Sequence, residues 1–426
     1  MDHTGRNQSD EMNDNLTIGF LNGKFLLGSE HRLSIFHGNC RVKDGKIISF
    51  DQDSTGYDLM VDLKGSLVTP SLINAHIHLG ETLFQGLKGK WNLEQYLMLA
   101  DYWNASLASK KSEAWFHSAN ATANEMIRYG TSVFCAARSS EIASRYGMKA
   151  FSGYPLMESK KLSSFLIDGF QKYVEFSKIA NELGSQPGVF LHSLYSNGKS
   201  TLELARKCLS YGTNFLTVHV AETLESCKKV KDKWGRSDID ILQHYGMLNE
   251  DTILVHGGYC SLEELKVISS MGSKVVLCPV SNHRLGTRCL NPTDLENERI
   301  KWCLGTDGLA TGISADLFQH MRFMKRMFPD LAEWKLWSAI TYWAAQVLGI
   351  ENSNGKLDVG YNADLCVFQT ETPDSVETIL RWLVFQKRKP LCLYISGNRI
   401  NSKNIEIPSV YRPLQPLTTD ILSRWN

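Results

Sequence analysis

The sequence predicts an α/β protein, in which a (β/α)8 TIM barrel is joined to a small β-sandwich domain formed by both chain ends. Three observations support this prediction. Eight short apolar segments between residues 70 and 349 alternate with helical patterns, which is typical of parallel strands covered by helices. Residues 16–69 and 350–410 instead alternate short apolar runs with glycine turns. At 426 residues, the chain is also longer than one average domain.

The expected barrel strands are short and rich in Val, Ile, Leu, Phe and Cys. They are 72–78, 131–136, 149–153, 188–192, 215–220, 252–256, 274–278 and 300–305. Helical patterns follow at 112–129, 162–182, 202–209, 238–244 and 262–270, and another helix is expected to begin near 91–97. Eight strand–helix units predict a barrel whose chemistry lies at the carboxyl ends of the strands. Residues 1–15 are expected to be a disordered tail, and 411–426 a C-terminal tail.

The composition narrows the function classes. The formal net charge is +1, which favours neither a nucleic-acid partner nor an anionic membrane. No apolar run approaches the roughly 20 residues of a membrane-spanning helix. None of the ten cysteines forms a C-x-x-C pair, which favours reduced core thiols and a cytoplasmic protein.

Potential metal ligands gather at the predicted strand ends. His76 and His78 lie one residue apart in the first strand, so their side chains are expected on one face. His219 and His256 fall near the ends of the fifth and sixth strands, and Asp307 follows the eighth. Imidazole and carboxylate groups at strand ends are typical ligands of a divalent metal.

Each of these residues also has a simpler interpretation. A single histidine at a strand end, such as His192 or His256, can serve a structural hydrogen bond. Asp307 before Gly308 can form a turn, and Glu222 can stabilise a helix N-terminus. Their common location at one barrel mouth favours a functional site over these separate structural roles.

The motifs resemble those of the amidohydrolase superfamily. The resemblance spans about residues 16–405 and is to its cytosine-deaminase-like branch, which includes methylthioadenosine/S-adenosylhomocysteine deaminases, aminodeoxyfutalosine deaminases and s-triazine chlorohydrolases. The motifs that carry it are Pro-Ser-Leu-Ile-Asn-Ala-His-Ile-His at 70–78, His-Val-Ala-Glu at 219–222, His-Gly at 256–257, Cys-Pro-Val-Ser-Asn at 278–282, Gly-Thr-Asp-Gly at 305–308 and Gly-Tyr-Asn-Ala-Asp-Leu at 360–365.

The resemblance implies a role for each matched residue. His76, His78, His219 and Asp307 would bind one divalent metal, for which zinc is favoured and iron is the alternative. The fourth strand ends in His192 and has no lysine to bridge a second metal, so a mononuclear site is expected. Glu222, His256 and Asp307 are the expected catalytic residues.

The chemistry has physical reasons of its own. A divalent metal lowers the pKa of bound water towards about 7. Asp307 can take the proton of the attacking water, Glu222 can protonate a ring nitrogen of the substrate, and His256 can direct the water. These steps would replace an exocyclic amine by oxygen and release ammonia.

Substrate contacts are expected from loops around the site and from positions at which this chain departs from the common pattern of the family. His192, Glu81, Glu94 and Asn282 are the candidates, and Arg138, His283 and Arg288 are weaker ones. The family often has His-Ala-Pro-Tyr-Ser at the fourth strand, whereas this chain has His-Ser-Leu-Tyr-Ser at 192–196. Such differences leave the substrate open.

Three functions are compatible with these residues. The first is a deaminase of a purine nucleoside or related N-heterocycle, with water as the second substrate. The second keeps the metal and changes the leaving group, as in a chlorohydrolase or a cyclic-amide hydrolase. The third is an inactive binding protein on the same scaffold, against which the complete ligand set and Glu222 argue. A homo-oligomer is compatible with the family.

Overall fold

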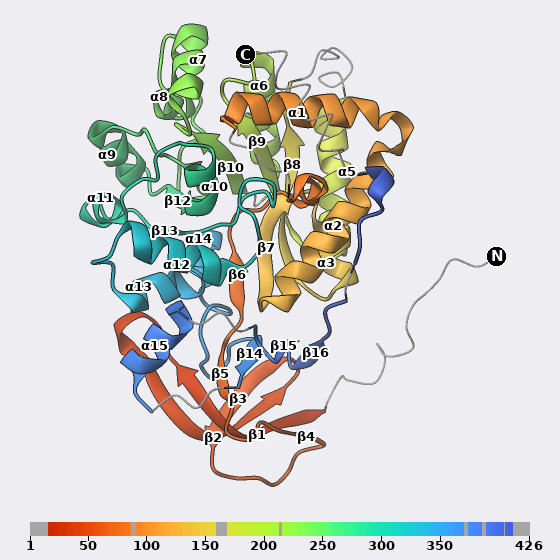
Figure 1. Cartoon of the computed structure of the whole chain (residues 1–426), viewed down its shortest axis with the longest axis vertical. Coiled ribbons are helices and arrows are strands. Elements are labelled where there is room, and N and C mark those ends of the chain that lie inside the picture. The colour runs from red at the N-terminus through yellow and green to blue at the C-terminus, as the bar shows by residue number, and fades with distance from the viewer. Residues whose placement is uncertain are drawn as a thin grey trace, which may run out of the picture.

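The computed structural model describes residues 16–86, 91–158, 168–212, 215–369, 374–385, 389–403 and 405–411. Two sheets organise the chain, a barrel of parallel strands and a second sheet at one end of it (Figure 1). The tail expected at 1–15, all but the first residue of the one at 411–426, and residues 162–167 of an expected helix lie outside the described residues.

Eight parallel strands form the barrel sheet, and neighbours in sequence are neighbours in space. They are β6 (Leu72–Asn74), β7 (Thr131–Ala137), β8 (Lys149–Leu156), β9 (Gln186–Ser193), β10 (Phe215–Val220), β11 (Thr252–His256), β12 (Lys274–Leu277) and β13 (Trp302–Leu304). This arrangement confirms the predicted TIM barrel and explains why the strands are apolar throughout, because parallel strands are buried on both faces.

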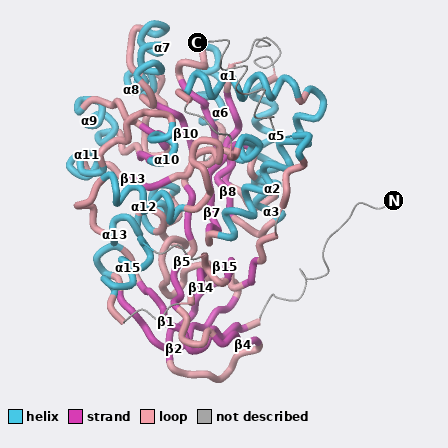
Figure 2. The backbone as a smooth tube through the Cα atoms, in the orientation of Figure 1, coloured by secondary structure: helices cyan, strands magenta, loops and turns pink. Residues whose placement is uncertain are grey.

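Helices surround the strands (Figure 2). They are α2 (Lys111–Arg128), α3 (Ser140–Arg145), α5 (Gly169–Glu182), α6 (Lys199–Leu209), α7 (Leu224–Trp234), α8 (Asp238–His244), α9 (Leu262–Ser270), α10 (Pro279–Arg284), α11 (Pro292–Asn297), α12 (Leu317–Met327), α13 (Glu333–Ser338) and α14 (Tyr342–Leu348). The helix expected near 91–97 is α1 (Leu93–Ser106), which begins at an Asn92 cap that accepts from the Gln95 amide. A short 3-10 helix, η2 (Leu79–Phe84), follows the first strand.

The seam between the first and last barrel strands is closed by other groups. The Ile73 amide donates to the Ile340 carbonyl at 3.0 Å, and the Leu304 amide donates to the Ala339 carbonyl at 2.9 Å. The connection between α13 and α14 therefore lies between β6 and β13. A side-chain hydrogen bond also joins the end of β6 to the segment after β13, where the Asn74 side chain donates to the Thr306 hydroxyl at 2.8 Å.

The prediction of a strand over 72–78 was wrong in its length. The strand ends at Asn74, so His76 and His78 lie in the irregular segment after it. The strand ends early because the following residues bond to the segment after the last strand. The His76 carbonyl accepts from the amides of Thr306 and Asp307, both at 3.0 Å. The chain leaves the ladder there to cross towards the last strand.

The second sheet combines both chain ends, as the sequence predicted. Its strands are β1 (Thr17–Leu27), β2 (Ser34–Lys43), β3 (Lys46–Asp51), β4 (Leu59–Asp62), β5 (Leu67–Pro70), β14 (Leu365–Phe368), β15 (Cys392–Ile395) and β16 (Asn398–Ile400). They form one hydrogen-bonded sheet, in which β5 pairs with both β1 and β14. The predicted division into 16–69 with 350–410 and 70–349 remains a prediction.

Alternate residues of this sheet face two different cores. Leu67 and Phe368 belong to the large core shared with the barrel, whereas Val68 and Val367 belong to a smaller core of their own sheet. This is the two-residue period of a β-strand. Helix α15 (Val376–Phe385) buries Ile379 and Leu383 in the same large core. The two sheets are therefore packed together by one continuous apolar layer.

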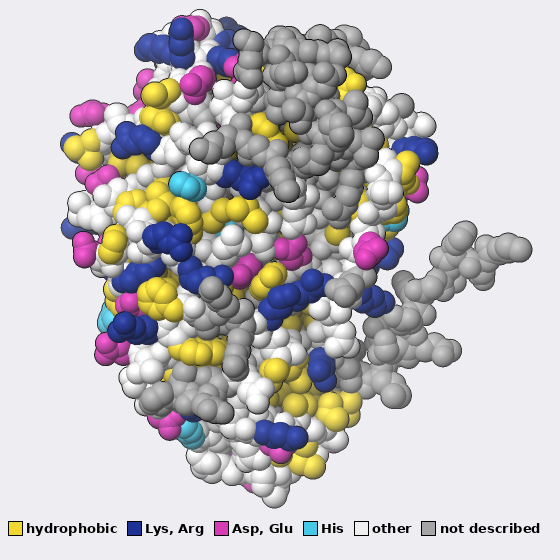
Figure 3. Space-filling model, viewed as in Figure 1, with side chains coloured by type: hydrophobic (Ala, Val, Ile, Leu, Met, Phe, Trp, Pro, Cys, Tyr) yellow, Lys and Arg dark blue, Asp and Glu magenta, His cyan; other side chains and the backbone are white. Residues whose placement is uncertain are grey.

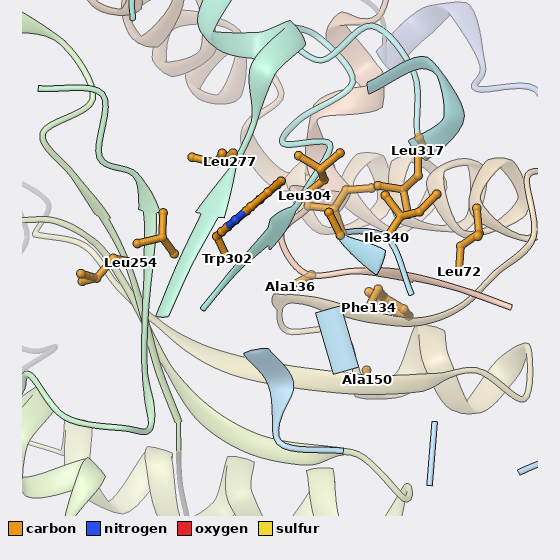
Figure 4. Close-up of a cluster of buried hydrophobic side chains, with 14 of the residues drawn as sticks. Leu72, Phe134, Ala136, Ala150, Leu254, Leu277, Trp302, Leu304, Leu317 and Ile340 are labelled. Atoms are coloured by element: carbon orange, nitrogen blue, oxygen red, sulfur yellow. The ribbon is translucent and has the colours of Figure 1, made fainter. Parts of the chain in front are cut away.

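The barrel part of that core is drawn in Figure 4, where Phe134 and Leu254 extend from strands and Leu317 and Ile340 from later segments. The face shown in Figure 3 carries mixed charge, with basic, acidic and hydrophobic side chains interspersed. All ten cysteines are free thiols. None of the helices in the described residues combines the length and apolar character needed to cross a membrane.

Candidate metal centre and active site

Four side chains converge beyond the carboxyl ends of the barrel strands. His76, His78, His219 and Asp307 each offer one ligand atom, and these atoms all lie within 4.8 Å of one another. Nε2 of His78 lies 3.1 Å from Oδ1 of Asp307, and Nε2 of His219 lies 3.2 Å from Nε2 of His76. The structure thus brings together the four predicted ligands from three separate parts of the chain.

The backbone fixes the direction of His219. Its Nδ1 lies 2.5 Å from the carbonyl oxygen of His192 on the neighbouring strand β9. A carbonyl can only accept, so Nδ1 carries the proton and the Nε2 lone pair faces the other three donors. A hydrogen bond of this kind is what orients imidazole ligands in metal sites.

The carboxylate of Asp307 is held in place by two kinds of contact. The Ser281 hydroxyl donates to Oδ2 at 2.5 Å, while Oδ1 faces the two histidines. Burial acts to raise the pKa of Asp307, but His76 and His78 outweigh it and hold the pKa well below its usual range. Burial lowers the pKa of His76 to about 4. Burial acts to lower the pKa of His78, but Glu81 and Asp307 outweigh it and raise the pKa to about 9. Because a divalent cation binds a carboxylate and neutral imidazoles, its binding would displace the proton of His78.

The backbone is unusual beside these side chains. Ala221, His256 and Asp307 have φ values of 44°, 72° and 60°, in the left-handed region that non-glycine residues rarely adopt. Each lies at or just after the end of a barrel strand. Such conformations cost roughly 1–3 kcal/mol and gather at functional sites.

Glu222 and His256 face each other beside the four donors. Nε2 of His256 lies 3.7 Å from Oε1 of Glu222, and both side chains are buried. Burial raises the pKa of Glu222, with His256 opposing it. On its other side, His256 Nδ1 lies 2.8 Å from Oδ1 of Asn282. The Asn282 amide group donates in turn to the Arg288 carbonyl at 2.7 Å.

Glu81 also lies against the cluster, on η2. A Cβ atom at position 308 would overlap its carboxylate, so the glycine after Asp307 provides the space that Glu81 occupies. Oε2 of Glu81 is buried and has no hydrogen-bond partner among the described residues. Burial raises the pKa of Glu81 to about 7 even though His78 opposes the shift. A buried acceptor without a partner needs a ligand or a proton.

The other predicted substrate contacts lie farther out. His192 Nδ1 contacts the hydroxyls of Ser193 and Ser196 at 3.1 Å and 2.9 Å, and its ring centroid is 5.2 Å from that of His219. Glu94 is exposed on α1 and pairs with Lys229 of α7 at 3.0 Å. Glu94 and Lys229 line a cavity of about 210 Å³, together with Thr223, which follows Glu222 in the chain.

The three weaker candidates lie outside the cluster. Arg138 is exposed and lines a separate cavity of about 530 Å³. His283 is exposed, with its ring centroid 5.0 Å from that of Phe323. The Arg288 guanidinium lies over the Tyr259 ring at 5.6 Å.

Comparison with known proteins identifies the family of this chain. The model of the amidohydrolase family matches residues 67–400, which is most of the chain. The chain belongs to the amidohydrolase family. This amidohydrolase is therefore a hydrolase, as the motifs indicated.

Several curated relatives of this amidohydrolase are deaminases. It is 27% identical over 371 residues to a 5-methylthioadenosine/S-adenosylhomocysteine deaminase of Pyrococcus abyssi, covering 83% of this chain and 85% of the relative. It is also 27% identical over 364 residues to a 5'-deoxyadenosine deaminase of Methanobrevibacter smithii, covering 80% and 82%.

Solved structures share the fold. An adenosine deaminase from Xanthomonas campestris with bound zinc superposes with a TM-score of 0.82 at 19% identity, over 96% of this chain and 97% of that one. An atrazine chlorohydrolase from Arthrobacter aurescens, complexed with zinc, gives a TM-score of 0.81 at 15% identity, over 95% and 100%. At this identity the likeness supports the fold of the amidohydrolase and no more.

Several residues around the site were not identified from the sequence. Ser281 holds Asp307, Thr287 donates to the Glu222 carbonyl oxygen, and Asp238 accepts from the Ala221 amide. Ser281 lies in the Cys-Pro-Val-Ser-Asn motif, which could have revealed it. Asp238 follows a serine at a helix start, so its sequence context indicates only a helix terminus.

Proposed function

We propose that this amidohydrolase is a metal-dependent deaminase that replaces the exocyclic amine of a purine nucleoside or a related N-heterocycle by oxygen and releases ammonia. The observation that carries the proposal is the position of Glu222. This buried acid faces His256 beside four converging donors, with its pKa raised by burial. A raised pKa favours the protonated form of a carboxyl group, and that form can donate its proton to a ring nitrogen.

The donor set fits one divalent metal. Three imidazoles and one carboxylate match the ligand preferences of zinc, which we propose as the native ion over iron. Two of the four donors are held by other groups of the protein, since His219 is oriented by a backbone carbonyl and Asp307 by Ser281. A metal held by His76, His78, His219 and Asp307 would lower the pKa of a water molecule towards about 7.

The protein side chains divide the proton transfers between them. Asp307 accepts the proton of the attacking water and later delivers it to the departing amine. Glu222 donates to the ring nitrogen next to the reacting carbon, so that no full negative charge builds up there. His256, fixed at Nδ1 by Asn282, directs its Nε2 towards the water. The net change is C–NH2 plus water to C=O plus ammonia.

The substrate contacts that we propose surround this centre. Glu81 offers an unpaired buried oxygen, and His192 offers an imidazole whose pKa is lowered to about 4 by burial. Glu94 lies on the wall of the 210 Å³ cavity, where a carboxylate can accept from ribose-like hydroxyls. Asn282 acts through His256, because both ends of its amide are already engaged.

The deaminase relatives support this proposal over its alternative. A chlorohydrolase or cyclic-amide hydrolase would use the same site with another leaving group, and a solved chlorohydrolase shares the fold. Ten free cysteines support a reducing compartment, and we propose the cytoplasm. An assembly of identical subunits remains a prediction.

The test is a panel of substrates given to the zinc-loaded protein. We expect ammonia release from 6-aminopurine nucleosides, including 5'-deoxy and 5'-thioether forms, at a higher kcat/KM than from aminopyrimidines. Halide release from chlorotriazines without ammonia release would favour the alternative. The absence of any hydrolysis by protein that holds one zinc per chain would contradict the proposal.

A further inference from the structure

Asp238 is a buried carboxylate outside the cluster described above. It is the first residue of α8, and its Oδ2 accepts from the backbone amide of Ala221 at 3.3 Å. The neighbouring charged side chain that acts on Asp238 is another acid, Glu264, rather than a cation. Burying a carboxylate without a counter-charge is costly, so its position calls for a reason.

Ala221 supplies that reason. The ladder between β10 and β11 ends with the pair Val220 and His256, so the Ala221 amide is the first one beyond it. Its φ of 44° turns the chain sharply just before Glu222. A buried amide in such a conformation needs an acceptor, and the acceptor is Asp238.

The segment that carries Glu222 is held at other points as well. The Tyr259 amide donates to the Ala221 carbonyl at 3.0 Å. The Thr287 hydroxyl donates to the Glu222 carbonyl oxygen. The carbonyl groups on both sides of Glu222 are therefore held, and among the described residues Asp238 is the side chain that accepts from the Ala221 amide.

We infer that Asp238 is a positioning residue, which holds Ala221 in its left-handed conformation and thereby directs the Glu222 side chain towards His256. The inference rests on the proposed role of Glu222. It adds that α8, which offers no group to the cluster itself, controls the direction of the proton donor. Asp238 acts through the backbone and contacts no reacting atom.

A role in capping α8 is a distinct function that other residues perform. The Ser237 hydroxyl accepts from the Asp240 amide at 3.3 Å, and the Asp240 carboxylate accepts from the Ser237 amide at 3.5 Å. Asp240 is exposed, whereas Asp238 is buried and turned to Ala221. Asp240→Ala is therefore a matched control that weakens the helix start and leaves the Ala221 contact intact.

The test compares Asp238→Leu, Asp238→Asn and Asp240→Ala in the zinc-loaded full chain. Asp238→Leu removes the acceptor, and we expect kcat to fall about 10- to 100-fold because a displaced catalytic group loses about that much. KM and zinc content should stay close to the parent values. Asp238→Asn keeps an acceptor oxygen and should restore kcat, and Asp240→Ala should leave kcat unchanged. If Asp238→Leu does not fold, Asp238→Ala replaces it.

Amide hydrogen exchange in peptides covering residues 220–226 separates this inference from the proposed function. Exchange should become faster in Asp238→Leu and stay at the parent rate in Asp238→Asn and Asp240→Ala. Unchanged exchange and unchanged kcat in Asp238→Leu would overturn the inference, as would equal losses in Leu and Asn variants. If the parent protein hydrolyses no substrate, the proposed function fails, and the exchange rates alone decide whether Asp238 holds Ala221.

Discussion

Nδ1 of His219 lies 2.5 Å from the carbonyl oxygen of His192, one strand away in the barrel. The carbonyl assigns the proton of the imidazole to Nδ1, which leaves Nε2 free to bind a cation. A main-chain oxygen of the parallel sheet therefore sets the tautomer of an imidazole that we propose as a metal ligand. The fold thus orients this donor without a bound ion.

Replacing His219 should remove the metal. We expect His219→Ala to lower zinc affinity by at least about 100-fold, since even the loss of a supporting hydrogen bond costs 10- to 100-fold. Zinc per chain, measured by inductively coupled plasma mass spectrometry after dialysis against a weak chelator, checks this. His244→Ala removes an exposed histidine and should keep the parent zinc content. Full zinc content in His219→Ala would contradict the ligand assignment.

Glu222→Gln should separate metal binding from turnover. The amide keeps the size of the side chain and cannot donate a carboxylic proton, so kcat should fall by about 100- to 10,000-fold. Zinc content should remain that of the parent protein. Glu263→Gln changes an exposed acid on α9 and should leave kcat unchanged. Near-normal turnover of Glu222→Gln would exclude the proton-donor role.

Asn282→Ala should loosen His256. The variant loses the acceptor 2.8 Å from His256 Nδ1 and the donor to the Arg288 carbonyl. We expect a fall in kcat of about 10- to 100-fold with little change in zinc content. Steady-state kinetics of ammonia release measure the effect, and Asn297→Ala on the surface serves as the control. A change in KM alone would instead indicate direct contact with the substrate.

Asp238 should also shape the dependence of stability on pH. Burial raises the pKa of Asp238 to about 7 from an ordinary 3.8. The folded state then binds the proton more tightly, so the stabilisation present below pH 3.8 is lost as the pH rises to about 7. Relative to Asp238→Asn, the parent should lose up to about 1.4 kcal/mol per pH unit in this window. Parallel pH curves for denaturant unfolding of the two proteins would contradict the shift.

Asp364 should matter for stability rather than chemistry. Its carboxylate accepts from Ser132 at 3.2 Å, from the Asn354 side chain at 2.9 Å and from the Ser396 amide at 2.9 Å. Asp364→Ala leaves these donors unpaired and should lower the free energy of unfolding by about 3 kcal/mol or more. Asp358→Ala, at an exposed site, should change it by less than about 0.5 kcal/mol. Chemical denaturation with zinc present measures both, and equal values would contradict the assignment.

Local patterns were sufficient to predict the barrel strands and a gathering of histidines with Asp307 at one barrel mouth, because apolar runs and strand-end histidines lie in contiguous residues. The choice of His76, His78, His219 and Asp307 as the donor set came from the family resemblance. The strand end at Asn74 was not predictable in this way. It depends on Thr306, which is 232 positions away. Asp238 escaped detection for the same reason, since its partner Ala221 lies on another element. Residues that act through a distant backbone atom leave no periodic signal.

The continuity of β5 and β6 has a mechanical consequence. Only Ser71 separates Leu67–Pro70 of one sheet from Leu72–Asn74 of the other, and His76 and His78 follow within four residues. Two of the four proposed donors are thus connected to the second sheet by a short length of chain. Truncation or local unfolding of that sheet should therefore let the segment with His76 and His78 move. We expect a bound ion to be lost before the barrel itself unfolds.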